Sequence, residues 1–372
     1  MLKTRRSFAL AAAFVVALAV GGPAAATAAT TTDAGSAAPA AQARAAQAHA
    51  QAQAQAQGGE QGGEPGTPTP RVIRATRAAR VAPLDPPSSW GHATVLEGPA
   101  LGPDGRLYFV DFTAPAGHPK ILRYDPRTKK VISLHTDATS RFSSLQFSPA
   151  DGKIYVTDYD NGKIDRLDPD GTGFTTVFSG PVDGRVLVPD DIAFNKAGDM
   201  YITDYHGSLE KPDGRVVRLD ARGAHPVVLQ KGLSGPNGIS FTPDFSALWV
   251  SEYNLGREDH FTLAPDGKSI TGGGVGMSAN VGGGGFDSNS VDSAGNVYQV
   301  VLGAGKILVW NPSGDLLATI VIPQQPQPEP LVSNLVIKPG STHGYITVGG
   351  DNGGYLYTFH ALAPGLPQPA GR

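Results

Sequence analysis

The sequence predicts an all-β protein, a six-bladed β-propeller whose N-terminal strand closes the last blade. Glycine and proline supply 48 and 31 of the 372 residues, about twice their usual share, which excludes a helical bundle. Short apolar segments, each centred on one aromatic residue, recur every 46 to 49 residues. Each repeat contains three or four short strand signals and no helix signal. The six aromatic positions are Tyr108, Tyr155, Tyr201, Trp249, Tyr298 and Tyr345.

The N-terminus is typical of a cleaved export signal, which we place at residues 1–28. Lys3, Arg5 and Arg6 precede an apolar run from Phe8 to Val20, and small residues follow. The run is too short for the ~20 residues that cross a bilayer, so no membrane span is expected. Thr4–Leu10 matches the twin-arginine pattern, which predicts export of the folded protein to the cell envelope or medium. An ordinary signal with two adjacent arginines is the alternative.

Residues 29–84 are predicted to be a disordered spacer. Ala, Gln, Gly, Thr and Pro dominate up to Pro70, and such a segment buries too little apolar surface to offset the entropy of ordering. Arginines at steps of three follow and indicate either a short basic helical face or the solvated end of the linker. They are Arg71, Arg74, Arg77 and Arg80.

The six repeats occupy residues 85–362. Strand pairs such as Lys120–Tyr124 with Val131–Leu134, and four Pro-Asp-Gly turns, give each unit the antiparallel pattern of a propeller blade. The last unit ends at Tyr355–His360 without a fourth strand, whereas His92–Leu96 precede the first unit with nothing to pair. We therefore predict that the N-terminal strand completes the last blade. Residues 363–372 are predicted to be a flexible tail.

The composition and the missing motifs exclude several functional classes. A net charge of −3 provides no electrostatic field for nucleic acid. The absence of cysteine excludes disulfides, thiolate metal sites and cysteine nucleophiles. The chain also lacks the Gly-x-Ser-x-Gly elbow of serine hydrolases and the His-Glu-x-x-His zinc helix.

One register position carries oxygen-bearing side chains in all six repeats. The position lies four residues before the apolar anchor of each innermost strand, so in a propeller these side chains surround one end of the channel. They are Glu97, Ser143, Asp190, Asn237, Asp287 and Ser333.

A divalent cation would offset the repulsion among the three carboxylates of this register. At about 5 Å and an effective dielectric constant near 20, each pair of charges repels by about 3 kcal/mol. Oxygen ligands from Glu97, Asp190, Asn237 and Asp287 suit calcium (Ca2+). Magnesium or another divalent cation is the alternative, whereas zinc is disfavoured because no His or Cys occupies the register. The alternative without a metal is that these residues serve as turn or capping residues at the starts of the strands.

Residues at the ends of the second strands are expected to return to the same rim, because neighbouring strands run antiparallel. His206 is a candidate to bind substrate or carry a proton, although a histidine on a surface loop is more often structural. The rim residues are Asp111-Phe112, Asp158-Tyr159, Asp204-Tyr205-His206, Glu252-Tyr253 and Asp351.

Four motifs, taken together and in order, resemble the senescence-marker-protein/gluconolactonase/luciferin-regenerating family over residues 90–360. Within it the chain is most similar to the bacterial drug-responsive lactonase. The resemblance implies a six-bladed propeller with a catalytic calcium in the channel. The motifs are Glu97-Gly98-Pro99, Pro189–Phe194 with Thr203-Asp204-Tyr205, Gly235–Ile239, and Asp287-Ser288 before Val291–Asn296.

The resemblance also implies roles for individual residues. The family's metal ligands fall on Glu97, Asn237 and Asp287, with Asp190 where related phosphotriesterases carry Asn and the lactonase carries Asp. Ser288 follows the catalytic aspartate as in that lactonase, where gluconolactonases tend to have Gly, and we include it among the candidate metal ligands.

These assignments predict a secreted calcium-dependent hydrolase that opens lactone rings. Asp287 would transfer protons, and Asp191 would support the ligands from behind. A small-molecule lactone or ester is the expected partner. The alternatives are a phosphotriesterase acting on organophosphates, a non-catalytic ligand-binding propeller, and a metal-dependent lyase.

Overall fold

The computed structural model describes residues 69–83, 94–282, 284–323, 331–350 and 352–366. All described residues belong to one compact unit within Thr67–Arg372. The predicted export signal and the spacer up to residue 68 lie outside the described residues. No helix among the described residues is long and apolar enough to cross a membrane.

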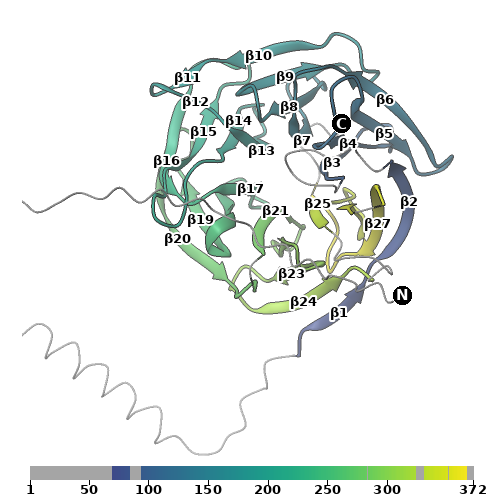
Figure 1. The fold of residues 1–372 in the computed structure, drawn as a ribbon. Helices are drawn as coiled ribbons and strands as arrows, with labels where there is room; N and C mark the ends of the chain where they lie inside the picture. The colour runs from purple at the N-terminus through teal and green to yellow at the C-terminus, as the bar shows by residue number, and fades with distance from the viewer. Residues whose placement is uncertain (1–68, 84–93, 283, 324–330, 351, 367–372) are drawn as a thin grey trace, which may run out of the picture. The chain divides into compact units, whose positions relative to one another are not determined.

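Six antiparallel sheets follow one another in chain order around a ring, which is the predicted propeller (Figure 1). In the first three blades four consecutive strands run from the channel outward. Blade 1 comprises β3 (Leu96–Leu101), β4 (Leu107–Asp111), β5 (Pro119–Asp125) and β6 (Lys130–Thr136). Blade 2 comprises β7 (Phe142–Phe147), β8 (Ile154–Asp158), β9 (Lys163–Leu167) and β10 (Thr175–Ser179). Blade 3 comprises β13 (Pro189–Phe194), β14 (Met200–Asp204), β15 (Gly214–Leu219) and β16 (Val227–Leu233).

Blade 4 repeats this order, blade 5 has a fifth strand at its outer edge, and blade 6 takes its outermost strand from the N-terminus. Blade 4 comprises β17 (Pro236–Phe241), β18 (Ala247–Glu252), β19 (Arg257–Leu263) and β20 (Ile270–Ser278). Blade 5 comprises β21 (Gly285–Val291), β22 (Val297–Leu302), β23 (Lys306–Trp310) and β24 (Leu316–Val321), with β1 (Arg71–Arg74) beyond them. Blade 6 comprises β25 (Leu331–Ile337), β26 (His343–Gly349), β27 (Gly354–His360) and β2 (Thr76–Ala82). A small hairpin joins β11 (Pro181–Val182) to β12 (Arg185–Val186) between blades 2 and 3.

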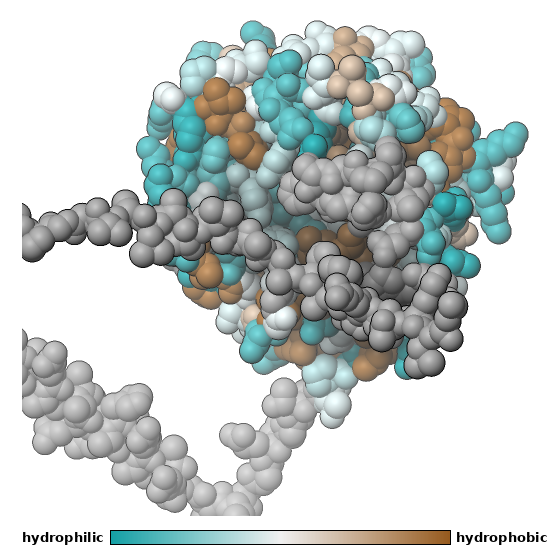
Figure 2. Space-filling view, viewed as in Figure 1, coloured by the Kyte–Doolittle hydropathy of each residue, from teal (hydrophilic) through white to brown (hydrophobic). Residues whose placement is uncertain are grey.

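The recurring aromatic residue packs each blade against the next. The Tyr108 ring meets the Phe147 ring of blade 2 edge-on at 5.0 Å, and Tyr201 meets Phe241 of blade 4 at 4.9 Å. Such T-shaped pairs add about 0.5–1.5 kcal/mol to area burial. The second strands of blades 1 to 3 are buried along their whole length, whereas the outer strand β6 has no buried residue. Hydrophilic residues accordingly cover much of the outer edge of the ring in view, with smaller hydrophobic patches between them (Figure 2).

The N-terminus closes the ring as predicted, but the strand that does so differs from the expected one. It is β2, which pairs antiparallel with β27. Of the expected segment His92–Leu96, Leu96 begins β3, and residues 92–93 lie outside the described residues. The propeller therefore begins before residue 85, inside the range assigned to the spacer. β1 lies in parallel beside β24, so the arginines at steps of three are on strands and not on a helix. The arginine pattern did not indicate strands, because an outermost strand needs few apolar side chains. In β2 only Val81 and Ala82 are buried.

The beginning of the predicted tail is also part of the fold. Pro364 accepts a hydrogen bond from the Ser293 backbone at 2.8 Å, and Gly365 donates to Ser341 at 3.0 Å. Leu366 packs against the buried cluster of blade 5. Residues 363–366 thus lie across the ends of blades 5 and 6, and the flexible tail was placed too early.

Candidate metal centre

A β-bulge interrupts the innermost strand of every blade at the predicted register position. The pairing of β13 with β14 shifts between Pro189 and Ile192, and that of β17 with β18 between Pro236 and Ile239. Blades 2, 5 and 6 have a register shift at this position, and in blade 1 the shift follows Glu97, which itself pairs with Val110. A bulge sets two residues against one of the partner strand and re-aims side chains, a device common next to active sites. The regular repeat therefore supplies six equivalent, specially oriented positions.

Four of the predicted residues form what we call the site ring: Glu97, Asp190, Asn237 and Asp287. Glu97, Asn237 and Asp287 are buried, and Asp190 is partly buried. The Asn237 amide donates a hydrogen bond to Asp190 Oδ2 at 2.9 Å. Ser143 and Ser333, the remaining register members, donate instead to the backbone oxygens of Pro189 and Leu96. The structure thus separates the ligand candidates from two serines that fasten neighbouring blades.

Simultaneous ionisation of the carboxyl groups in the site ring is strongly unfavourable. Burial, followed by the charges of Asp287, Asp191 and Asp190, raises the pKa of Glu97 well above its usual value. Burial and the neighbouring carboxylates likewise raise the pKa values of Asp190 and Asp287. None of the ion pairs in the described ranges involves these carboxylates. Four acids including Asp191 are therefore gathered without a cationic side chain to offset them.

Two oxygens of the site ring have no hydrogen-bond partner. They are Asn237 Oδ1 and Asp287 Oδ2, both buried. A buried unsatisfied oxygen costs about 1–3 kcal/mol, so its retention calls for an explanation such as an ion. Amide and carboxylate oxygens are what calcium and magnesium bind. Within the described part of the chain, no three His, Cys, Asp or Glu side chains already converge at metal-ligand distance, so the fit depends on this mixed donor set.

A second ring lies one residue further along each innermost strand. Its side chains are Ser144, Asp191, Ser288 and Asn334. Asp191 accepts hydrogen bonds from Ser144 and Ser288, and burial raises its pKa to about 6. Asn334 donates to Ser288 Oγ at 2.8 Å and to Glu97 Oε2 at 3.4 Å. Asp191 thus lies beside the site ring, and the Ser288 hydroxyl is engaged with Asn334 and Asp191.

Glycine occupies the two other positions of the second ring because the neighbouring backbone leaves no room. A Cβ at Gly98 would lie 2.3 Å from Leu145 N, and one at Gly238 would lie 2.6 Å from Asn289 N. The innermost strands of adjacent blades therefore approach each other closely just behind Glu97 and Asn237.

Hydroxyl groups from each preceding blade fix the backbone of three ligand candidates, a feature that the sequence analysis missed. Thr157 donates to the Asp190 carbonyl at 2.7 Å, and Ser251 donates to the Asp287 carbonyl at 2.7 Å. Thr203 makes the equivalent bond to Asn237. The signal was present: a hydroxyl residue directly before an acid recurs as Thr157-Asp158, Thr203-Asp204 and Ser251-Glu252. Asn334 was also missed, although it follows a register residue.

The rim residues lie beside the starts of the innermost strands, as predicted, but their acids are already bound. Asp204 pairs with Pro189 across the sheet and accepts from Arg215 Nε at 2.6 Å and from Val188 N at 2.8 Å. Glu252 likewise binds Arg257 and the Ser234 backbone. These acids hold the loops in place, and Asp351 lies outside the described residues.

His206 lies against the same structural acid. Its Nε2 is 3.4 Å from Asp204 Oδ1, and this buried nitrogen makes no hydrogen bond. The His206 backbone oxygen accepts from Gly235 N at 2.8 Å, which ties its loop to the strand of Asn237. The structure thus brings His206 to the rim and next to Asp204.

Behind the second ring the channel continues as a cavity of about 140 Å³. Its wall combines polar and aromatic side chains from the innermost strands, including Gln146, Asn289, Phe194 and Phe241. Asp191 borders both this cavity and the site ring, and Leu366 of the C-terminal segment lies at the cavity wall.

Residues 95–332 match the family model described as SMP-30/Gluconolactonase/LRE-like region. The chain is 31% identical to lactonase drp35 of Staphylococcus saprophyticus over 250 residues, covering 61% of this chain and 74% of that protein. It is 26% identical to lactonase drp35 of Staphylococcus epidermidis over 73% of this chain and 84% of that protein.

Two solved structures have a similar fold. A gluconolactonase from Xanthomonas campestris aligns with a TM-score of 0.59 at 21% identity, over 77% of this chain and 97% of that one. A calcium-binding regucalcin from Agrobacterium tumefaciens aligns with a TM-score of 0.62 at 16% identity, over 80% and 99%. At these identities the likeness establishes the shared propeller architecture.

Proposed function

Because this chain belongs to the SMP-30/gluconolactonase/LRE-like family, we propose that it is a hydrolase that opens lactone rings at a bound divalent cation. Glu97, Asp190, Asn237 and Asp287 would hold the cation, with calcium as the expected ion. The lactonases named among its relatives support the reaction class, and the regucalcin with a similar fold supports calcium.

The observation that carries the proposal is the gathering of buried carboxylates without any cationic partner. Burial and neighbouring carboxylates raise the pKa values of Glu97, Asp190 and Asp287, while Asn237 Oδ1 and Asp287 Oδ2 have no hydrogen-bond partner. A structural charge cluster would contain an arginine, as Asp204 does with Arg215. In a set made only of oxygen ligands, a hard cation would instead be the partner that the unpaired oxygens lack.

The chemistry divides between the ion and Asp287. When bound, the ion would act as a Lewis acid toward the ester carbonyl. Asp287 takes a proton at Oδ2 from the attacking water, whose oxygen bonds to the carbonyl carbon. The ring C–O bond then breaks, and Asp287 returns the proton to the departing alkoxide, so that the product is a hydroxy acid. Asn237 bonds to both Asp190 and Asp287 and thereby orients the two carboxylates.

Elemental analysis of the purified protein, followed by assays before and after chelation, tests the proposal. We expect about one equivalent of calcium per chain and lactone hydrolysis that disappears with a chelator and returns with calcium. A protein that binds no divalent ion, or that hydrolyses no member of a lactone panel, would contradict it. A fluorophosphate assayed beside the panel identifies the phosphotriesterase alternative.

We also propose that the protein is exported, on the basis of residues 1–28. Cell fractionation should recover the mature chain in the envelope or medium. Replacing both Arg5 and Arg6 with Lys should retain it in the cytoplasm if the twin-arginine route is used. Unchanged export of this variant would assign the leader to the general secretory route.

A further inference from the structure

The outermost strands of blades 5, 6 and 1 carry exposed basic side chains along one side of the ring. These side chains lie on β1, on β2 and where the turn after β5 leads into β6. The three strands contain no acidic residue. We call the six exposed side chains the basic belt: Arg71, Arg74, Arg77, Arg80, Lys129 and Lys130.

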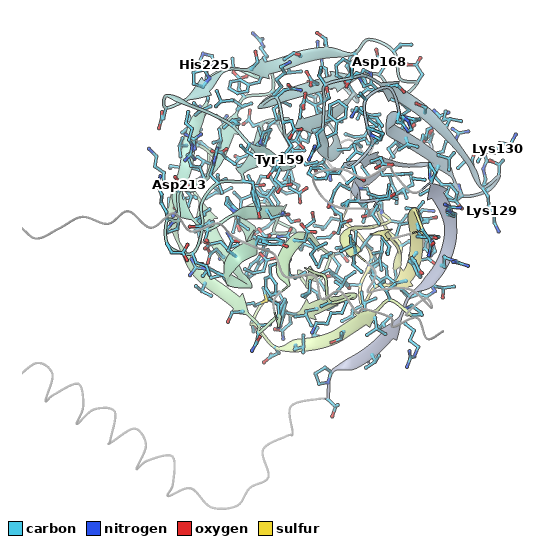
Figure 3. All side chains as sticks on the ribbon, viewed as in Figure 1. Lys129, Lys130, Tyr159, Asp168, Asp213 and His225 are labelled. Carbon is cyan, nitrogen blue, oxygen red and sulfur yellow. The ribbon has the colours of Figure 1, made fainter. Side chains whose placement is uncertain are left out.

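The basic belt continues across the boundary between blades 6 and 1. Ala79 of β2 and Val131 of β6 pack against the same buried cluster. Figure 1 shows β1 and β2 following one another along one side of the ring. Figure 3 places Lys129 and Lys130 at the outer edge next to that side. Three neighbouring blades therefore present positive charge on one continuous part of the outer edge.

Protection of sheet edges against aggregation does not account for this distribution. Charged side chains on edge strands prevent unwanted pairing, but β10 and β20, the edges of blades 2 and 4, contain none. The one charged residue of β16, the edge of blade 3, is Lys231, whose Nζ lies 3.1 Å from Asp183 Oδ2. Positive charge without a matching acid on the same strand is thus gathered on three adjacent edges.

Acids of the propeller do not neutralise most of the basic belt. Within the described residues, none of the arginine ion pairs involves Arg71, Arg74 or Arg80. The lysine ion pairs in the same ranges leave out Lys129 and Lys130. The charges of these five side chains are therefore available to an external anion.

Lys129 keeps its charge at an unfavourable backbone position. Its φ is 57°, in the left-handed region that glycine and asparagine adopt more readily than lysine. The nearest acid along the chain is Asp125, which accepts a hydrogen bond from Arg106 Nε at 3.2 Å. The fold of the turn would thus be served better by glycine or asparagine, and the local contacts give no reason for a lysine.

Both ends of the basic belt combine a cation with an exposed apolar side chain. Val72 is 65% exposed, the highest value for a large apolar side chain among the described residues, and stands two positions before Arg74. Ile132 is 41% exposed and stands two positions after Lys130. Side chains two apart in a strand project from the same face. Such pairs suit a surface that has charged groups above an apolar layer.

We propose that the basic belt docks the protein on a lipid bilayer with anionic phosphate headgroups. Four of its six cations are arginines, which can donate paired hydrogen bonds to phosphate. The Arg77 guanidinium lies 5.6 Å from the centroid of the Tyr355 ring, a cation–π contact that positions it at the surface. Because the belt follows outer strands, docking leaves both ends of the channel accessible.

Co-sedimentation with vesicles tests this docking surface. The chain from residue 29 onward contains the whole compact unit and lacks the predicted leader, whose apolar run would itself bind lipid. One set of vesicles contains equal parts of phosphatidylglycerol and phosphatidylcholine, and the other contains phosphatidylcholine alone. We expect binding to the anionic set that weakens as the salt concentration rises, and little binding to the neutral set. Equal binding to both sets would overturn the inference.

Two double variants with the same loss of charge separate the belt from the net charge of the chain. Arg71→Gln/Arg74→Gln should lower the partition coefficient on anionic vesicles by about 25-fold, or about fivefold for each basic residue near the surface. Arg222→Gln/Lys268→Gln removes two exposed cations from the loops before β16 and β20 and should change it less than about twofold. Equal losses in the two double variants would contradict a specific surface.

Lys129→Asn removes one charge and suits the backbone of the turn. We expect an unchanged or higher melting temperature together with about fivefold weaker vesicle binding. Val72→Ser should weaken binding to vesicles but not to soluble polyphosphate, since only the bilayer offers an apolar layer. Binding to polyphosphate without binding to vesicles would assign the belt to a phosphate polymer and overturn the lipid inference, as would vesicle binding that none of the belt variants changes.

Discussion

Asp287 is the residue on which the proposed reaction depends, since its Oδ2 is buried and unpaired beside the other carboxylates. Asp287→Asn keeps the shape but removes the proton acceptor, so we expect kcat to fall by about two to four orders of magnitude. Steady-state kinetics and a thermal melt on the same sample measure this. Asp266→Asn, at an exposed turn, should match the wild type in both. A fully active Asp287→Asn would remove the residue from the mechanism.

Thr203 shows how a residue outside the site ring can support it. Thr203→Val replaces the hydroxyl that binds the Asn237 carbonyl and leaves that buried oxygen without this donor. The loss should cost about 1–3 kcal/mol of unfolding free energy and weaken cation binding. Urea unfolding and calcium titration measure the two effects, and Thr203→Ser should restore both. Equal stability of the Val and Ser variants would show that the hydroxyl is not needed.

Glu258 predicts a pH dependence that is separate from the site ring. It is fully buried, contacts Asn289 at 3.0 Å, and burial raises its pKa well above the usual value. A folded acid with a raised pKa stabilises the protein below its unfolded pKa, near 4.3, and this stabilisation is lost as the pH rises toward the folded pKa. Glu258→Gln removes the titration, and its amide can pair with Asn289 Oδ1, which has no partner.

Thermal melts from pH 5 to pH 8 test this. The wild type should lose melting temperature relative to Glu258→Gln as the pH rises, so that the two curves diverge toward pH 8. Parallel curves would mean that Glu258 does not titrate in this range.

At this scale the sequence indicated the register of the site ring and Asp191 beside it, but not the other side chains that contact the ring. Glu97, Asp190, Asn237 and Asp287 were found because the repeat multiplies one register position six times. Asn334 and the hydroxyls of Thr157 and Thr203 depend on which neighbour each side chain reaches across a blade boundary. These contacts are determined by how the blades pack against one another, which the spacing of the repeat does not indicate.

Among the strands, β2 closes the ring, because it supplies the outer edge of blade 6. A chain beginning at residue 69 should melt like the full-length protein. A chain beginning at residue 83 loses β1 and β2, leaves the edge of β27 unpaired and exposes part of the cluster around Val81 and Leu356. We expect a clearly lower melting temperature and increased aggregation, measured by scanning calorimetry and light scattering. Identical melting of the two truncations would contradict a closing role.

The inner strands were predictable and the closing strand was not, for the same physical reason. Strands buried on both faces, such as β4 and β14, read as apolar runs around an aromatic residue. β2 is buried only at its last two residues and has the composition Thr-Arg-Ala-Ala-Arg-Val-Ala, so its backbone pairing leaves almost no trace in the residue pattern. The C-terminal residues 363–366 were missed similarly, since they are held by backbone hydrogen bonds.

For the molecule as a whole, the proposed ion would couple all the blades that contribute ligands. Chelation should therefore lower the melting temperature, because the ion binds the native ring and not the unfolded chain. At a free concentration one hundred times Kd the stabilisation is about 2.7 kcal/mol. Scanning calorimetry with and without a chelator measures it, and calcium should restore the original value. A melting temperature that does not respond to either treatment would argue against the site.

The pairing of β2 with β27 joins segments 282 positions apart, from Thr76 to Thr358. During synthesis the early segment emerges long before its partner exists, so the ring can be completed only after the ribosome has made the sixth blade. Contacts between such distant segments form late. Since the predicted leader precedes this early segment, a prematurely terminated chain would present its leader without a finished ring, and a route that accepts only folded cargo would reject it.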